Sequence, residues 1–274
     1  HSLKNGKHVL LANKESYVVA GEFLNKISKE SNSTIFPIDS EHSAIHQCLQ
    51  GIENKDSISR LILTGSGGPF LKRDLNDFAS ITPQEAVAHP VWTMGEKISV
   101  DSSTMMNKCL EIIEARWLFD IEDIDVIIHP EGIVHSMVEF GDNSVIAQLS
   151  VPDMKIPIAH GLGFPKKIPS GAEKLSLDKI KTLSFEEPDF RKFPALLLAK
   201  DCLKTGGTSF TILNAANEVC VDAFLKGKIT YLDIHKIISK VLDKSVITNV
   251  QEVEEFFEVD KQSRQETNSI IALD

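Results

Sequence analysis

The first part of the chain alternates short apolar runs with amphipathic stretches. Apolar runs at residues 9–12 and 34–38 predict two buried strands, and the amphipathic stretch at 17–29 between them predicts a helix. A strand, a helix and a second strand in this order are typical of a parallel βαβ unit. A further helix is predicted at 41–49, and a third strand at 61–64 follows a polar loop.

A long stretch rich in glycine, proline and polar residues follows, over residues 66–95. Within it, residues 82–85 (Thr-Pro-Gln-Glu) have the spacing of a capping box with proline at the first helical position, so a short helix should begin there. The remainder predicts irregular structure, as expected of a lid over a binding site. Residues 101–103 (Asp-Ser-Ser) are predicted to cap a helix at 104–119.

The second half of the chain predicts strands first and helices afterwards. A strand is predicted at 124–128, and two further strands, 136–140 and 144–149, flank a short turn as in a hairpin. The proline-rich segment 152–188 predicts an irregular linker. The predicted fold is therefore α/β, with an α+β catalytic domain built on a mainly parallel sheet, a linker and a small C-terminal helical bundle. The helices of that bundle are predicted at 194–203, 212–225, 231–242 and 250–257.

Composition narrows the class of protein only moderately. The chain has 274 residues with 42% apolar and 25% charged side chains, which is ordinary for a globular protein with a substantial core. A net charge of −10 argues against nucleic acid as the main partner. No apolar run approaches the roughly 18 residues of a membrane span, and no signal peptide is visible. The cysteines form no CxxC pair, so we expect free thiols in a reducing compartment.

Two carboxylates follow the second predicted strand. Asp39 and Glu41 are two residues apart, so in extended backbone they point to the same side of the chain. They lie just beyond the carboxyl end of a strand, where ligands bind in open α/β sheets. The alternative is that Asp39 or Ser40 caps the helix that follows, and for this pair taken alone capping is the more common role.

A second polar group is predicted on one side of the helix at 104–119. Asn107, Lys108 and Glu111 are spaced three and four residues apart and therefore share a helix face. Ser102 lies near the predicted helix start, where free backbone N–H groups favour anions. The alternative is a surface ion pair between Lys108 and Glu111, which is common on helices.

Together these groups could hold a metal beside a phosphate. Carboxylate ligands without histidine or cysteine favour Mg²⁺ or Mn²⁺ over zinc. The turn at 65–68 (Gly-Ser-Gly-Gly) offers backbone N–H groups and the Ser66 hydroxyl to a phosphate, although such turns also occur without ligands. His89 could donate to a phosphate or act as an acid, and Trp92 could cover an apolar substrate face. A structural histidine and a core tryptophan are the alternatives.

Several long motifs resemble one enzyme family, the 1-deoxy-D-xylulose 5-phosphate reductoisomerases. They occur in the order found in that family and extend over nearly the whole chain. The motifs are LLANKES (10–16), PIDSEH (37–42), LTGSGGPF (63–70), HPVWTMG (89–95), KISVDSSTMMNKCLEIIEARW (97–117), PDMKIPIAH (152–160) and LNAANE (213–218).

The resemblance implies an activity and a set of site residues. The family uses NADPH and Mg²⁺ or Mn²⁺ to convert 1-deoxy-D-xylulose 5-phosphate to 2-C-methyl-D-erythritol 4-phosphate in non-mevalonate isoprenoid biosynthesis. By resemblance the metal ligands are Asp39, Glu41 and Glu111, and the catalytic residues are Lys14, Glu41 and His89. The implied substrate contacts are Lys14, Ser40, Glu41, Ser66, His89, Trp92, Ser102, Asn107, Lys108 and Glu111. The implied NADPH contacts are Asn13, Glu15, Met94, Gly95 and Met154.

The family also begins with a Rossmann-type NADPH domain that carries a glycine-rich phosphate turn. No GxGxxG-like turn follows a strand in this chain, so we expect the nucleotide-binding domain to be missing and the chain to be inactive alone. The resemblance divides the chain into a junction (1–38), a catalytic domain (39–165), a linker (166–189) and a helical domain (190–274). It further implies a homodimer in the bacterial cytoplasm, with a plastid as the alternative location.

Two other functions stay open on the sequence alone. One is a metal-dependent sugar-phosphate isomerase or aldolase that works without a nicotinamide. The other is a non-catalytic fragment that serves in dimerisation, because the predicted hairpin at 136–149 offers strands for sheet extension between subunits.

Overall fold

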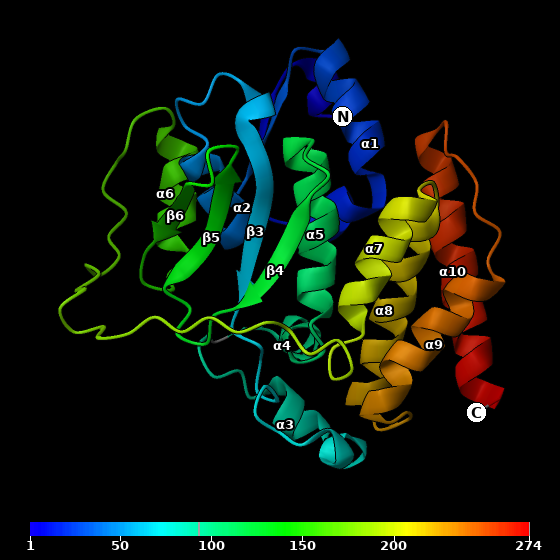
Figure 1. Cartoon of the computed structure of the whole chain (residues 1–274). Helices are drawn as coiled ribbons and strands as arrows, with labels where there is room; N and C mark the ends of the chain where they lie inside the picture. The colour runs from blue at the N-terminus through cyan, green and yellow to red at the C-terminus, as the bar shows by residue number, and fades with distance from the viewer. Residues whose placement is uncertain (93, 274) are drawn as a thin grey trace. The chain divides into compact units, whose positions relative to one another are not determined.

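The computed structural model describes residues 1–92 and 94–273 (Figure 1). Thr93, which belongs to the motif at 89–95, lies outside the described residues. The chain forms two compact units, each built from separated segments. The first unit consists of His1–Lys14, Leu24–Gly67 and Glu114–Pro188, and the second of Glu15–Phe23, Gly68–Ile113 and the chain from Asp189 onward. The division into 1–38, 39–165, 166–189 and 190–274 that the resemblance implies stays a prediction.

A four-stranded sheet with the order β4-β3-β5-β6 forms the core of the first unit (Figure 1). Its strands are β3 (Ile58–Gly65), β4 (Ile124–Ile128), β5 (Val134–Phe140) and β6 (Val145–Leu149). The predicted hairpin is confirmed, since β5 and β6 pair antiparallel. The prediction of a mainly parallel sheet was wrong for these four strands. Among them β3 and β4 run parallel, whereas β3 and β5 are antiparallel. The connection between β4 and β5, residues 129–133, is too short for a parallel crossover.

The predicted βαβ unit at the start of the chain is confirmed. Strands β1 (His8–Leu11) and β2 (Thr34–Pro37) are parallel, and α1 (Lys14–Glu30) connects them. Helix α2 (Ser40–Cys48) follows β2 and packs on β5 and β6. A short 3-10 helix, Leu3–Asn5, precedes β1, and another, Lys55–Ser57, precedes β3.

The segment 152–188 was predicted to be irregular, but it contains helix α6 (Lys155–Gly163), which packs on α2 and β2. Pro157 lies in the first turn of α6, where a missing backbone N–H costs no intrahelical bond. Proline content alone therefore misled the prediction here. Beyond α6 the segment is largely irregular, and it is fastened to the sheet by an antiparallel bridge between Ile128 and Glu186.

Helices dominate the second unit. The C-terminal bundle contains α7 (Ala195–Thr205), α8 (Ser209–Leu225), α9 (Tyr231–Lys244) and α10 (Val253–Leu273), and α8 packs against both α9 and α10 (Figure 1). The 3-10 helix Leu75–Ser80 and helix α3 (Pro83–Val87) lie within the predicted lid. The capping box of α3 is confirmed, since the side chains of Thr82 and Glu85 each accept the other's backbone N–H.

The prediction that residues 101–103 cap a helix was wrong. They form the last turn of α4 (Glu96–Ser103), and the next helix, α5, spans Met106–Phe119. Met105 has a positive φ of 61°, which breaks the helix, and the Thr104 hydroxyl accepts the Met106 N–H at 3.2 Å. Ser102 therefore lies at the carboxyl end of a helix, so a helix N-terminus does not favour an anion there.

Two predictions from composition can be compared with the structure. The four cysteines are free and buried, and burial raises the pKa of Cys48 to about 11. In residues 1–92 and 94–273 we find no helix that combines the length and the apolar character needed to cross a membrane.

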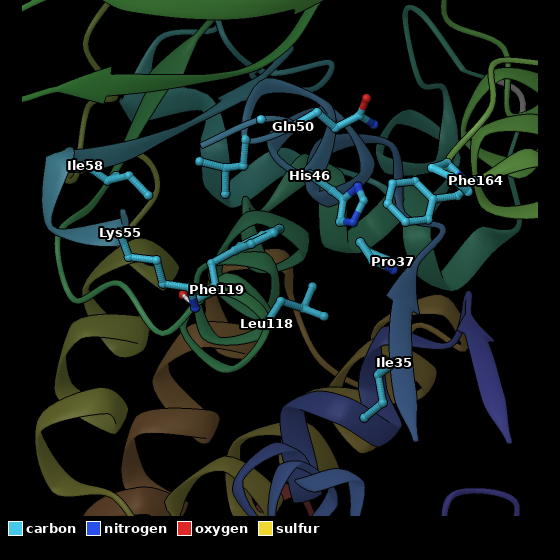
Figure 2. Close-up of a pocket in the computed structure, with 12 residues that line it drawn as sticks. Ile35, Pro37, His46, Gln50, Lys55, Ile58, Leu118, Phe119 and Phe164 are labelled. Atoms are coloured by element: carbon cyan, nitrogen blue, oxygen red, sulfur yellow. Dashed lines mark hydrogen bonds between the residues drawn. The ribbon is translucent and has the colours of Figure 1, made fainter. Parts of the chain in front are cut away.

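The first unit contains a cavity of about 500 Å³ between β2, α2 and the end of α5 (Figure 2). Its walls are mostly apolar, with His46, Gln50 and Lys55 as polar groups. Among the described residues, none of the predicted site residues lines this cavity. His46 Nδ1 lies 3.0 Å from Nε2 of His160, so the cavity borders a pair of imidazoles in which His160 is buried, at 5% exposed, and His46 is half-buried.

We expect this imidazole pair to make the first unit less stable in acid. Burial, together with nearby His46 and Lys167, lowers the pKa of His160 from 6.5 to about 4. The folded state therefore binds fewer protons than the unfolded state between these values. The first unit therefore keeps its full free energy of unfolding above pH 6.5. As the pH falls to about 4, this free energy decreases by on the order of 2–3 kcal/mol.

Urea unfolding at intervals from pH 7 to pH 4 measures this effect. The variant His160→Gln should lose stability less steeply than the parent over the same range. An equally steep loss in the variant would show that other groups cause the acid sensitivity.

Candidate active site

The residues after β2 both cap a helix and present carboxylates. Asp39 is the N-cap of α2, and its Oδ1 accepts the Glu41 N–H at 3.3 Å. The Ser40 hydroxyl donates to Glu41 Oε2 at 2.5 Å. The capping alternative weighed from the sequence is therefore correct for Asp39, but it uses only one of the two carboxylate oxygens.

The second oxygen of Asp39 pairs with Lys14. Lys14 Nζ forms an ion pair with Asp39 Oδ2, and Lys14 is only 7% exposed. Lys14 begins α1 shortly after the end of β1, and Asp39 follows the neighbouring parallel strand β2. The carboxyl ends of two parallel strands thus bring an ammonium and a carboxylate together at one edge of the sheet.

The sequence prediction missed two buried residues beside Asp39. His42 Nδ1 lies 3.1 Å from Glu114 Oε2 and 3.8 Å from Asp39 Oδ1. His42 and Glu114 are 0% and 1% exposed, and the donor atoms of the three side chains all lie within 4.8 Å of one another. His42 could have been found, because it lies one helical turn after Asp39 in the predicted helix.

The group on α5 has the shared face predicted for it. Asn107 Nδ2 donates to Glu111 Oε1 at 2.5 Å, and Lys108 Nζ forms an ion pair with Glu111 Oε2. Glu111 and Lys108 are only 1% and 4% exposed. A surface salt bridge, the alternative weighed from the sequence, is therefore excluded, because both charges are buried.

The glycine-rich turn lies after β3, and Ser66 is half-buried in it. Gly68 has a φ of +65°, and a Cβ added there would lie 2.8 Å from the Ser102 carbonyl oxygen and 3.1 Å from Ser103 Cα. Both are backbone atoms, so only glycine allows the turn to approach the end of α4 this closely.

His89 is a hydrogen-bond acceptor on one side of its ring. Its Nδ1 accepts the backbone N–H groups of Val91 at 3.1 Å and Trp92 at 2.9 Å. Burial lowers the pKa of His89, which favours the neutral ring. With Nδ1 accepting, the proton of the neutral ring lies on Nε2, which makes Nε2 a hydrogen-bond donor.

The residues assigned to NADPH by resemblance are spread along the chain. Asn13 is exposed just before α1, and Met154 is the exposed N-cap residue of α6. Met94 is half-buried, and Gly95 is the N-cap of α4. Glu15 accepts a hydrogen bond from Lys97 Nζ at 2.8 Å.

Lys97 was a further residue that the sequence prediction missed. Besides Glu15, its Nζ contacts Asp101 Oδ2 at 2.8 Å, and Asp101 is 1% exposed. Lys97 and Asp101 are one turn apart on α4, so their spacing in the sequence could have predicted this ion pair.

The predicted site residues divide between the two units. Lys14, Asp39, Ser40 and Glu41 meet in the first unit, and Asn107, Lys108 and Glu111 meet in the second. Of the others, Asn13, Ser66 and Met154 belong to the first unit, and Glu15, His89, Trp92, Met94, Gly95 and Ser102 to the second.

Buried carboxylates and ammonium groups, together with a glycine-rich turn at the end of a strand, are typical of the active site of an α/β enzyme. The comparisons with known proteins make this more specific. A domain model described as the 1-deoxy-D-xylulose 5-phosphate reductoisomerase C-terminal domain matches residues 35–119, and one described as the DXP reductoisomerase C-terminal domain matches residues 149–266. The chain belongs to the 1-deoxy-D-xylulose 5-phosphate reductoisomerase family.

Similar proteins support this assignment over nearly the whole chain. The reductoisomerase of Chlorobium chlorochromatii (strain CaD3) is 50% identical over 265 residues, covering 96% of this chain and 69% of that protein. That of Janthinobacterium sp. (strain Marseille) is 49% identical, covering 98% and 70%.

Solved structures agree with the fold. The Zymomonas mobilis reductoisomerase in complex with NADPH has a TM-score of 0.93 at 44% identity, covering 98% of this chain and 70% of that one. A DOX-P reductoisomerase in complex with NADPH, fosmidomycin and magnesium has a TM-score of 0.92 at 43% identity, covering 99% and 72%. The predicted α/β class is confirmed.

Proposed function

We propose that this chain carries the metal and substrate site for the rearrangement and NADPH-dependent reduction of 1-deoxy-D-xylulose 5-phosphate to 2-C-methyl-D-erythritol 4-phosphate. The observation that carries the proposal is the pair of polar groups that the fold keeps out of water: Lys14 with Asp39, and Lys108 with Glu111. Burying such charges is costly, and a ligand that uses them is a physical reason to retain them.

The proposed metal ligands are Asp39, Glu41 and Glu111. Their donor atoms are carboxylate oxygens, which suit Mg²⁺ or Mn²⁺ better than zinc. The position of Glu114 supports the choice of Glu111. The two lie one turn apart on one face of α5, and Glu114 contacts His42, which lies one turn after Asp39 in α2.

Most of the proposed phosphate and substrate contacts are neutral donors or ammonium groups. Lys108 brings a positive charge, and Asn107 brings an amide. The neutral His89 ring offers its Nε2 proton. Further contacts are proposed for Lys14, Ser40, Glu41, Ser66, Trp92, Ser102 and Glu111.

These residues fit the chemistry of the family reaction. A bound divalent metal polarises substrate carbonyl and hydroxyl oxygens, and bound NADPH supplies the hydride that reduces the rearranged aldehyde. The Lys14 ammonium would stabilise negative charge that develops on a substrate oxygen beside Asp39. His89, held by two backbone N–H groups, would keep one fixed proton directed at the substrate.

The predicted lid would exclude water from this site. Residues 66–95 carry Ser66, His89, Trp92 and Met94, so binding of the phosphate could draw the segment closed.

NADPH contacts are proposed for Asn13, Glu15, Met94, Gly95 and Met154.

Metal binding is tested by thermal unfolding with and without Mn²⁺. At about 100 times its dissociation constant the ion should stabilise the chain by about 2.7 kcal/mol and raise Tm by a few degrees. Asp39→Asn should remove this response. Asp142→Asn, a carboxylate in the loop after β5, should keep it. An unchanged response in Asp39→Asn would contradict the proposed site.

We also propose that the chain acts as a homodimer. Strand β6 lies at the edge of the four-stranded sheet, and Val145 and Ile146 on it are 48% and 43% exposed. An apolar edge strand favours pairing with a second copy.

The named relatives are bacterial, which favours the bacterial cytoplasm over a plastid as the location.

A further inference from the structure

Two C-terminal helices hold the last turn of α4 from both sides of Ser102. Asn217 on α8 donates its Nδ2–H to Asp101 Oδ1 at 2.9 Å, and both side chains are buried. Tyr231, the first residue of α9, donates its hydroxyl proton to the Ser103 carbonyl oxygen at 2.7 Å. The neighbours of Ser102 on both sides are therefore fixed by side chains from more than a hundred residues further along the chain.

The Tyr231 ring also supports the chain that leaves the glycine turn. It packs edge-on against Phe70, two residues after Gly68, with ring centroids 5.4 Å apart. Phe78 and Phe224 pack on it in the same way at 5.9 and 5.8 Å. Burial raises the pKa of Tyr231, so the hydroxyl stays protonated and remains a donor to Ser103.

The glycine turn completes the enclosure of Ser102. Because a Cβ at Gly68 would lie 2.8 Å from the Ser102 carbonyl oxygen, the two backbones are in direct contact. Tyr231 thus touches both segments of this contact, one through its hydroxyl and the other through its ring. A displacement of either segment would move the Ser102 hydroxyl.

We propose that Tyr231 and Asn217 are positioning residues that fix Ser102 for recognition of the substrate phosphate, so that the C-terminal helices serve binding as well as folding. The inference rests on the proposed role of Ser102 in the phosphate site. In this proposal neither side chain contacts the substrate itself. Each acts through the backbone of α4, where a shift of about 1 Å is enough to weaken a directed contact.

The test compares binding of 1-deoxy-D-xylulose 5-phosphate with binding of 1-deoxy-D-xylulose, which lacks the phosphate, by calorimetry in the presence of Mn²⁺. Tyr231→Phe removes one hydroxyl and keeps the ring. We expect it to raise Kd for the phosphorylated sugar about 10-fold, as loss of one buried hydrogen bond does, and to leave Kd for the other sugar unchanged. Asn217→Ala should have the same selectivity.

Thr230→Ala provides the matched control. Thr230 is the N-cap of α9 and forms a capping box with Asp233, directly beside Tyr231. Its removal should lower Tm without changing Kd, because the contact with Ser103 remains. An equal loss of affinity in Thr230→Ala would mean that destabilisation of α9 alone explains the effect and would overturn the inference.

Ser102→Ala separates this inference from the proposed function. If Ser102→Ala leaves Kd for the phosphorylated sugar unchanged, Ser102 is not a phosphate contact and that part of the proposed site is wrong. If Ser102→Ala weakens binding while folded Tyr231→Phe and Asn217→Ala bind normally, the positioning role is wrong. Selective loss in all three variants supports both.

Discussion

Replacing Glu111 by glutamine is expected to abolish Mn²⁺ binding by this chain and nearly all turnover by the full-length enzyme that carries the NADPH domain. The change keeps the size of the side chain and one carbonyl oxygen but removes the negative charge that a hard cation requires. Loss of a metal ligand should weaken Mn²⁺ affinity by more than about 100-fold, since even partners beyond the ligands are worth 10- to 100-fold. Electron paramagnetic resonance of free Mn²⁺ measures affinity in this chain, and NADPH oxidation measures turnover in the full-length enzyme.

The fold should survive this replacement, because apolar neighbours such as Leu110 and Ile113, 1% and 0% exposed, anchor α5 in the core. Circular dichroism and Tm check this point. Glu122→Gln, at a side chain that is 89% exposed, is the control and should bind Mn²⁺ normally. Near-normal turnover of Glu111→Gln at saturating Mn²⁺ would remove Glu111 from the metal site.

Replacing Gly68 by alanine is expected to destabilise the second unit by on the order of 2–4 kcal/mol and to weaken substrate binding. A positive φ costs an L-residue about 1–2 kcal/mol. The added Cβ would also meet the Ser102 oxygen at 2.8 Å, and backbone atoms cannot rotate away as a side chain does. Urea unfolding gives the stability, and calorimetry with the phosphorylated sugar gives the binding.

Gly227→Ala separates the two causes. Gly227 has a φ of +68°, close to the +65° of Gly68, but no atom lies within 4 Å of its added Cβ. It should therefore show only the backbone cost, and the difference between the two variants measures the clash. Equal destabilisation by both replacements would show that the approach to Ser102 is loose.

The sequence predicted elements whose signals are local. The capping box at Thr82 and Glu85 depends on residues three apart, and it is present as predicted. The same holds for the βαβ unit and the shared face of Asn107 and Glu111. Each of these signals lies within one element or a few neighbouring residues, so no distant contact is needed to read it.

Features that depend on distant contacts were missed. Helix α10 was predicted to end near 257 but continues to Leu273. The prediction stopped too early because the buried face of the helix includes the polar residues Ser263 and Thr267, which give no apolar pattern. Their hydroxyls donate to carbonyls four residues earlier, at 2.7 Å, which allows burial without an apolar pattern. The Asp101 partner Asn217 likewise lies on another helix, so spacing could not reveal it.

The two carboxylate oxygens of Asp39 have separate tasks, and this decides which replacement is informative. Oδ1 accepts the Glu41 N–H at the start of α2, and Oδ2 faces Lys14. Replacement by alanine would remove both oxygens, so the effect of a frayed helix could not be distinguished from the loss of a metal ligand. Asparagine caps helices as well as aspartate does, so it can keep the first task while discarding the charge. Replacing a single oxygen of Asp39 by the amide nitrogen of asparagine therefore tests the chemistry of the site while the start of α2 stays capped.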